Sequence, residues 1–171
     1  MFESRGFNLF MAFVCHQLLL AAFYFQYVEG MEPCPLCIFQ RVAVFVLGIW
    51  FLVHGIHKPL SASRWHYFYN IGGLFTSLVG AGIAGRHAYL QSLPADEVPA
   101  CGPSLDYLVD ILPFMELLDV VLKGSGECAK VSWDMWGLSM PTWLLLFFIG
   151  CIGLLLWRIY RNAKPSRRLF G

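Results

Sequence analysis

The chain has 171 residues, of which 58% are hydrophobic and 13% are charged, and its formal net charge at pH 7 is +1. This composition is too apolar for a water-soluble domain of such length and indicates a membrane protein. The small net charge gives no sign of a nucleic-acid partner, because here the charges are informative through their distribution and not through their total.

Four segments are long enough to cross a bilayer, which requires about 20 mostly apolar residues. They cover residues 7–28, 38–56, 68–89 and 141–160. The first is too long for the apolar core of a signal peptide and has no cleavage site of small residues, so we expect it to stay attached. The sequence predicts a single all-α membrane domain over residues 1–171, an antiparallel bundle of four transmembrane helices with exported loops at 29–37 and 90–140.

Lysine and arginine indicate the orientation, because the cytoplasmic loops of membrane proteins are enriched in them. Basic residues precede the first segment, separate the second from the third and follow the fourth: Arg5, Lys58, Arg64, Arg158, Arg161, Lys164, Arg167 and Arg168. The loop at 90–140 is acidic by contrast. We expect both termini in the cytoplasm and the two remaining loops on the exported side. The basic tail could also bind anionic lipid, but the topology already accounts for it.

Two cysteines stand three positions apart in the motif EPCPLCIFQR, at the exported end of the second segment. A disulfide between Cys34 and Cys37 closes a ring so small that it adds little stability, and such bridges are more often redox-active than structural. Pro35 suits the first position of a helix, which would place Cys34 near the N-cap and Cys37 in the first turn. The helix dipole and the unpaired N–H groups there favour a thiolate at Cys37.

Arg41 follows Cys37 by four residues, so we expect it one turn along the same helix face. Helical side chains lean toward the N-terminus, which would bring the guanidinium beside the sulfur. A lone arginine at a helix end would be interpreted as snorkelling to lipid headgroups. Next to a dithiol, Arg41 is better interpreted as steadying a thiolate or the polar end of a bound acceptor.

Small residues recur at spacing four in the third segment. They form two neighbouring stripes: Gly73, Ser77, Ala81 and Gly85, and beside them Gly72, Thr76, Gly80 and Ala84. Such stripes let helix backbones approach closely in membranes, so the pattern predicts tight helix packing.

The long exported loop contains a second cysteine pair, Cys101 and Cys128. Between them apolar residues recur at helical spacing and are interrupted at Pro113, which predicts short amphipathic helices lying on the membrane. From these residues alone, a structural disulfide that closes the loop is as good an interpretation as redox chemistry. After the loop, we expect Trp133, Trp136 and Trp143 in the interfacial belt of the membrane.

A zinc site is not expected. A CxxC motif is a common half of a zinc site, but Cys101 and Cys128 are far apart in sequence, no histidine lies in either exported loop, and an oxidising compartment favours disulfides over zinc thiolates. The other two cysteines, Cys15 and Cys151, lie within the first and fourth segments and are interpreted as packing residues. A haem-binding quinol protein would need histidines stacked inside the bundle, whereas His54, His57 and His66 cluster at the cytoplasmic ends.

In this order and topology, the features resemble the DsbB family of bacterial inner-membrane disulfide-forming proteins. The resemblance rests on CPLCIFQR at the start of the second segment, on the loop cysteine pair and on the stretch WDMWGLSMPTW, and it covers almost the whole chain. It implies a quinone-dependent protein-disulfide oxidoreductase of the bacterial inner membrane with periplasmic cysteine loops. Such an enzyme reoxidises the soluble periplasmic dithiol oxidase DsbA and passes the electrons to a membrane quinone, either ubiquinone or menaquinone.

The resemblance also assigns the order of thiol exchange. Cys101 would accept the attack of the partner's thiolate and form the mixed disulfide. Cys128, once released, would attack Cys34 in the CxxC disulfide, and Cys37 would remain as a thiolate against the quinone ring.

The quinone site is implied by the same resemblance. Arg41 would bind the quinone, and His87, in the stretch GRHAYLQ, matches a histidine near it. His87 is almost equally well interpreted as a polar residue at the membrane interface. Gln40 stands where some family members have an acidic residue before the arginine, which leaves the tuning of the site open.

Two other protein classes contain comparable cysteines. A vitamin K epoxide reductase-like enzyme also combines a CxxC motif, loop cysteines and a helical bundle, but there the CxxC motif comes last. A non-catalytic four-span scaffold with structural disulfides would have cysteines that never turn over.

Overall fold

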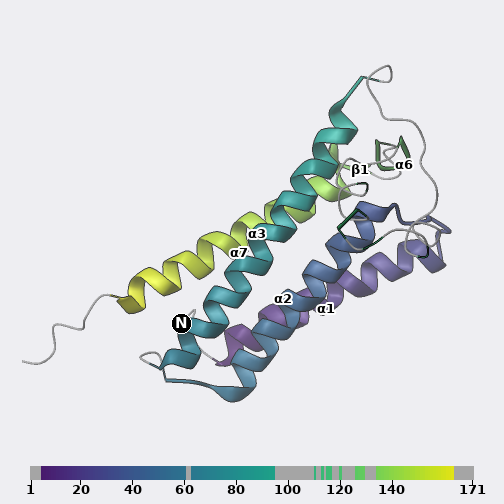
Figure 1. The fold of residues 1–171 in the computed structure, drawn as a ribbon. Helices are drawn as coiled ribbons and strands as arrows, with labels where there is room; N and C mark the ends of the chain where they lie inside the picture. The colour runs from purple at the N-terminus through teal and green to yellow at the C-terminus, as the bar shows by residue number, and fades with distance from the viewer. Residues whose placement is uncertain are drawn as a thin grey trace, which may run out of the picture.

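The computed structural model of the chain describes residues 5–60, 63–94, 110, 113, 115–116, 120, 126–129 and 134–163. Four of its helices are long and apolar enough to cross a membrane: α1 (Arg5–Tyr27), α2 (Pro35–His57), α3 (Arg64–Ser92) and α7 (Met140–Ala163). Each predicted span corresponds to one of these helices (Figure 1). The protein is therefore the four-helix membrane bundle that its sequence predicts.

Most of the helix ends lie outside the predicted apolar segments, because capping residues and not hydropathy decide where a helix begins. Cys34 is the N-cap of α2 and Pro35 its first residue, as the sequence predicts. Ser63 caps α3 by accepting a hydrogen bond from the Trp65 N–H at 3.4 Å. At its other end α2 stops at Lys58, whose left-handed backbone (φ 47°) turns its N–H onto the His54 carbonyl.

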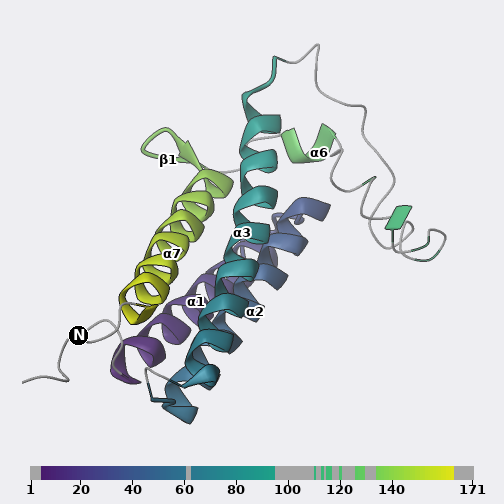
Figure 2. The same ribbon diagram turned by 60° about the vertical axis from the view of Figure 1, so that its left-hand side comes forward.

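The helices pack in chain order, with α1 on α2, α2 on α3 and α3 on α7 (Figures 1 and 2). Their shared core includes Val44, Leu47 and Phe51 of α2 with Phe148 and Leu155 of α7. The two cysteines expected to be packing residues, Cys15 and Cys151, are buried in this same core.

The predicted stripes of small residues lie where α3 meets its neighbours. A Cβ atom added at Gly72 would lie 2.6 Å from the Trp50 ring of α2, and one added at Gly80 would overlap the Phe148 ring of α7. The Trp50 indole also donates a hydrogen bond to Thr76 at 3.1 Å. Close packing of α3 on both sides therefore depends on glycine at these positions.

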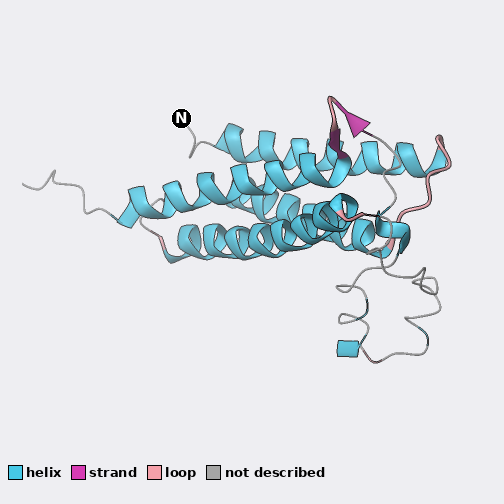
Figure 3. Cartoon of the chain, turned by 90° about the horizontal axis from the view of Figure 1, so that it is seen from above, coloured by secondary structure: helices cyan, strands magenta, loops and turns pink. Residues whose placement is uncertain are grey.

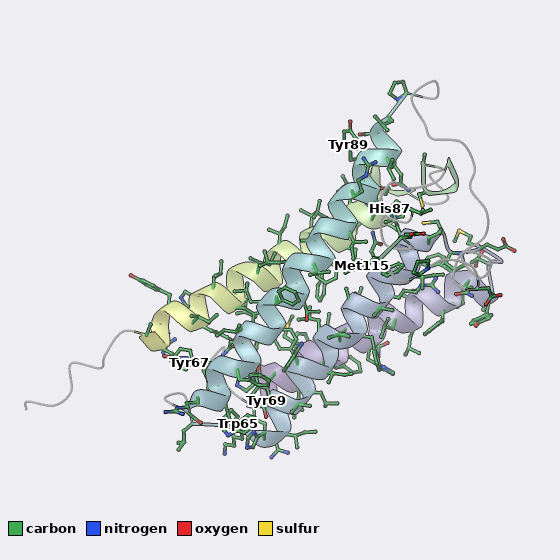
Figure 4. All side chains as sticks on the ribbon, in the orientation of Figure 1. Trp65, Tyr67, Tyr69, His87, Tyr89 and Met115 are labelled. Carbon is green, nitrogen blue, oxygen red and sulfur yellow. The ribbon has the colours of Figure 1, made fainter. Side chains whose placement is uncertain are left out.

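A buried polar network joins the helices at the end of the bundle that holds the short α2–α3 connection. Imidazoles of His54 and His66 are 3.2 Å apart, and the Asn162 amide lies 2.7 Å from the other ring nitrogen of His66. Close to them, Arg158 of α7 donates to Asn8 of α1 at 2.8 Å. Figure 4 shows Trp65 and Tyr67, the chain neighbours of His66, at the end of α3 opposite His87.

A two-stranded hairpin precedes α7, and the sequence analysis did not predict it. Strands β1 (Asp134–Met135) and β2 (Leu138–Ser139) pair antiparallel, and Figure 3 shows them beside the start of α7. Trp136 and Gly137 have φ of 56° and 76°, as a two-residue type I′ turn requires. The Trp136 ring is 86% exposed and meets Trp143 edge-on at 6.1 Å, while Trp133 lies outside the described residues.

The amphipathic helices expected between Cys101 and Cys128 fall mainly outside the described residues. The described part of this segment includes one short helix, α6 (Gly126–Ala129), which packs against α3 (Figure 2).

Candidate active site

The CxxC motif forms the N-terminus of α2. The Cys37 N–H donates to Cys34 Sγ at 3.4 Å, which is the capping bond of the helix, and the two sulfurs are 3.2 Å apart. That separation exceeds the S–S bond length of about 2.05 Å, so no disulfide joins the two cysteines in this structure. Cys34 is only 8% exposed. The helix start thus holds both sulfurs close enough for a small movement to join them.

His87 reaches this dithiol from α3. Its side chain is 2% exposed, with Nε2 3.8 Å from Cys34 Sγ and Nδ1 4.0 Å from Cys37 Sγ. Figure 4 shows it at the end of the bundle where α2 begins. The structure therefore brings His87 to two cysteines that are 53 and 50 positions away in the chain.

Two further contacts fix the orientation of the His87 ring. The Gln40 amide nitrogen lies 3.2 Å from Nδ1, and the Cys128 carbonyl oxygen lies 3.1 Å from Nε2. An amide nitrogen can only donate and a carbonyl oxygen can only accept. We therefore assign the proton to Nε2, which donates to Cys128, and leave Nδ1 as the acceptor.

Cys128 lies against the CxxC motif. Its side chain is 1% exposed and packs in a cluster with Cys34, Leu36 and Leu90. The packing of α6 on α3 and the His87 contact to the Cys128 backbone hold it there. The structure thus places Cys128, one member of the second cysteine pair, next to the first pair. Cys101 lies outside the described residues.

Arg41 is turned toward α1. Its guanidinium donates to the Ala22 carbonyl at 3.0 Å and to the Gln26 side chain, and it lies 5.5 Å from the centre of the Phe23 ring. The sequence predicts the guanidinium beside the Cys37 sulfur, and the structure shows that its hydrogen bonds go to the neighbouring helix. The cause is the close packing of α1 on α2, which offers oxygen acceptors to the arginine at short range.

A cavity of about 510 Å³ adjoins the dithiol and has walls from all four long helices. Most of its lining is apolar and includes Leu18, Phe25, Val44, Trp143, Leu144 and Phe147. Its polar lining comes from the two CxxC cysteines together with Glu32, Gln40, Arg41, His87 and Gln91. This volume falls within the range of about 300–1,000 Å³ that is typical of small-molecule sites. The arrangement suits an apolar ligand whose polar groups meet hydrogen-bond donors next to a dithiol.

Two glutamines of the site were not assigned a role by the sequence analysis. Gln40 bonds to His87, and Gln26 accepts from Arg41. Their positions inside apolar spans were a usable signal. An uncharged polar side chain there is costly unless it has a hydrogen-bond partner in the bundle, so each glutamine predicts such a partner.

Comparison with known proteins gives a consistent result. The family model described as disulfide bond formation protein DsbB matches residues 4–158. The chain is 47% identical over 158 residues to disulfide bond formation protein B of Nitrosococcus oceani, with 92% of both chains covered. It is 46% identical over 152 residues to the protein of the same name from Stutzerimonas stutzeri, covering 88% of this chain and 92% of the relative. The corresponding protein of Hahella chejuensis is 50% identical over 129 residues, which cover 75% of this chain and 77% of the relative.

Proposed function

The chain belongs to the DsbB family of disulfide bond formation proteins, and from that premise we propose that it reoxidises a DsbA-like periplasmic dithiol oxidase and passes the electrons to a membrane quinone. The observation that carries the proposal is the packing of Cys128 against the CxxC dithiol beside an apolar cavity. The protein is a multi-pass membrane protein. We place it in the bacterial inner membrane with cytoplasmic termini and periplasmic cysteine loops, as its charge distribution favours.

Two cysteine pairs suit a transfer between a soluble partner and the bilayer, since a single pair cannot easily meet both. Cys101 accepts the attack of the partner's thiolate, which forms a mixed disulfide and releases Cys128 as a thiolate. Cys128 attacks Cys34 of the CxxC disulfide, which forms a Cys34–Cys128 disulfide and displaces Cys37 as a thiolate. The partner's second thiolate resolves the mixed disulfide and releases Cys101, and the Cys101 thiolate attacks Cys128, which re-forms the loop disulfide and releases Cys34. The partner leaves oxidised, the loop disulfide is restored and the CxxC motif is left as a dithiol. The burial of Cys128 beside Cys34 supports the middle step.

The cavity residues fit a quinone. The apolar side chains of the helices suit its ring and the start of its tail, and Gln40, Arg41 and His87 offer hydrogen-bond donors or acceptors for its oxygens. When bound, a quinone accepts two electrons and two protons as the dithiol becomes a disulfide. His87 Nδ1, 4.0 Å from Cys37 Sγ, is placed to take the thiol proton.

The test is oxidation of a reduced DsbA-like protein by the purified enzyme, with ubiquinone and menaquinone analogues supplied in turn. We expect multiple turnovers only with a quinone present. Serine at position 34, 37, 101 or 128 should abolish continuous turnover. Cys15→Ser and Cys151→Ser are the matched controls, because they remove buried thiols elsewhere in the core and should preserve it. Full multiple-turnover activity in Cys37→Ser would contradict the proposal.

A further inference from the structure

The dithiol and the His87 imidazole form a cluster of soft metal ligands. One ligand atom from each of Cys34, Cys37 and His87 can be chosen so that all lie within 4.8 Å of one another. We propose that the reduced site binds a thiophilic d¹⁰ cation, Zn²⁺, through these three residues, and that the bound ion holds the dithiol in its reduced form. The proposal needs a reduced dithiol but does not depend on quinone use.

The distances are close to those of a tetrahedral site. With Zn–S of about 2.3 Å and Zn–N of about 2.0–2.1 Å, neighbouring ligand atoms lie roughly 3.6–3.8 Å apart. In the structure the two sulfurs are 3.2 Å apart, Nδ1 lies 4.0 Å from Cys37 Sγ, and one ring nitrogen lies within 4.8 Å of both sulfurs. Side-chain shifts of up to about 1 Å would reach the tetrahedral spacing.

The surroundings of His87 match those of a metal-binding histidine. Such a residue typically donates its second ring N–H to a carboxylate or a backbone carbonyl, which fixes the ring and its tautomer. Here the Nε2–H group of His87 donates a hydrogen bond to the Cys128 carbonyl oxygen at 3.1 Å. Nδ1, which faces the Gln40 amide at 3.2 Å, is therefore the ligand atom, and the cation would replace that amide contact.

The charges also favour a divalent ion. Cys34 and Cys37 bind as thiolates, so each ion that binds releases two thiol protons and the complex of Zn²⁺ with both sulfurs is neutral. Neutrality matters because Cys34 and His87 are buried, and an uncompensated charge there would be costly. Three protein ligands leave the fourth coordination position of the zinc ion open, and the adjoining cavity gives a further ligand access to that position.

Binding is restricted to one redox state. The CxxC disulfide has no thiolates to offer, so Zn²⁺ binds only the dithiol and opposes its oxidation. The exported loops contain no histidine, and for that reason the sequence predicts no zinc site. The histidine in this cluster comes instead from α3, where helix packing alone brings it to the dithiol.

The test uses the full chain with the double substitution Cys101→Ser/Cys128→Ser, which removes the two loop thiols and keeps the backbone carbonyl at position 128. Cys15 and Cys151 remain, buried in the core cluster away from the site. The protein is reduced, freed of reductant and titrated with Zn²⁺ against a coloured chelator. It is titrated separately with Co²⁺, whose visible spectrum reports thiolate coordination. We expect one ion per reduced chain and none per oxidised chain.

Ligand variants decide the role of His87. His87→Ala should weaken Zn²⁺ binding at least tenfold and change the cobalt spectrum. His87→Cys should restore tight binding with a sulfur-richer spectrum, which separates ligand loss from misfolding. His16→Ala is the matched control because His16 is exposed on α1, and it should change neither measurement.

Two results would overturn the proposal: a reduced protein that binds no Zn²⁺, or a His87→Ala variant with unchanged affinity and an unchanged cobalt spectrum. Loss of quinone turnover with zinc binding intact would count against the proposed function alone. In the wild-type enzyme, we expect added Zn²⁺ to inhibit turnover and a chelator to restore it.

Discussion

At the scale of single residues, Cys34 combines two roles. Its sulfur is half of the dithiol and also accepts the Cys37 N–H that caps α2. Serine is a favoured N-cap residue, so Cys34→Ser retains a capping oxygen while it removes the redox chemistry. Serine variants of this motif therefore test function without removing the start of the helix.

Arg41 lines the cavity that we propose as the quinone site, so its substitution tests that proposal. We expect Arg41→Ala to raise the apparent Michaelis constant for quinone by roughly tenfold to a hundredfold, because a hydrogen bond to a charged group contributes about 1.5–3 kcal/mol. Arg41→Lys should be intermediate, since lysine keeps the charge but loses the planar fork. The measurement is quinone-dependent turnover, with the rate of exchange between the partner and the enzyme recorded separately.

Arg86→Ala is the matched control for that experiment. Arg86 stands one residue before His87 on α3, and its guanidinium lies 5.5 Å from the centre of the Tyr89 ring. It does not line the cavity. Because Arg41 also bonds to α1, the melting temperature of each variant is compared with that of the wild type, which separates a loss of stability from a loss of quinone binding. If Arg41→Ala leaves the apparent Michaelis constant for quinone unchanged, then Arg41 only connects α1 to α2, and the quinone binds elsewhere.

At the scale of elements, α3 is the helix on which the site depends. It packs on both α2 and α7, carries His87 and supports α6. Its glycines set how closely the neighbouring helices approach, and that approach brings His87 to the start of α2. A change in the α3 packing should therefore affect both stability and the geometry of the dithiol.

Gly80→Ala tests this packing against a control on the same helix. The added methyl group would overlap the Phe148 ring, which is fully buried, so we expect the repacking to lower stability by about 1–3 kcal/mol. Gly82 has open space around its Cβ position, and Gly82→Ala should be neutral or stabilise the helix by up to about 1 kcal/mol. Melting temperatures in detergent give the comparison, and equal values for the two variants would argue against close α3–α7 packing.

At the scale of the whole molecule, the two ends of the bundle differ in chemistry. One end holds the dithiol, His87 and the cavity. The other holds a buried polar network that includes His54, His66 and Arg158, and an apolar core separates the two. The division matches the charge distribution of the sequence, in which basic residues lie near the polar end.

The orientation of the bundle can be tested by labelling. In a variant without the native cysteines, Ser92→Cys lies at the end of α3 beside the site, and Leu60→Cys lies in the short connection after α2. Both native side chains are exposed. We expect a membrane-impermeant maleimide to label Ser92→Cys in intact spheroplasts and Leu60→Cys only after permeabilisation. The reverse pattern would invert the proposed topology.

Much of this protein could be predicted from local sequence. The four spans follow from runs of apolar residues, because a bilayer requires about 20 of them whatever the neighbouring helices do. The start of α2 follows from Pro35 and Cys34, because capping involves only residues within one turn. The burial of Cys15 and Cys151 also agrees with their positions inside apolar spans. The β1–β2 turn also depends only on neighbouring residues, Trp136 and Gly137, but it was not predicted.

The composition of the site was decided by tertiary structure. Cys34 and His87 are 53 positions apart and meet only because α3 packs on α2 at one particular rotation. Arg41 also bonds to α1, which its spacing from Cys37 does not predict, since a long side chain takes the acceptors that a neighbouring helix offers. Runs of apolar residues determine which segments are helices, but they leave open how these helices rotate against each other. Only side-chain packing between helices removes that degeneracy and brings the histidine, the dithiol and Cys128 together.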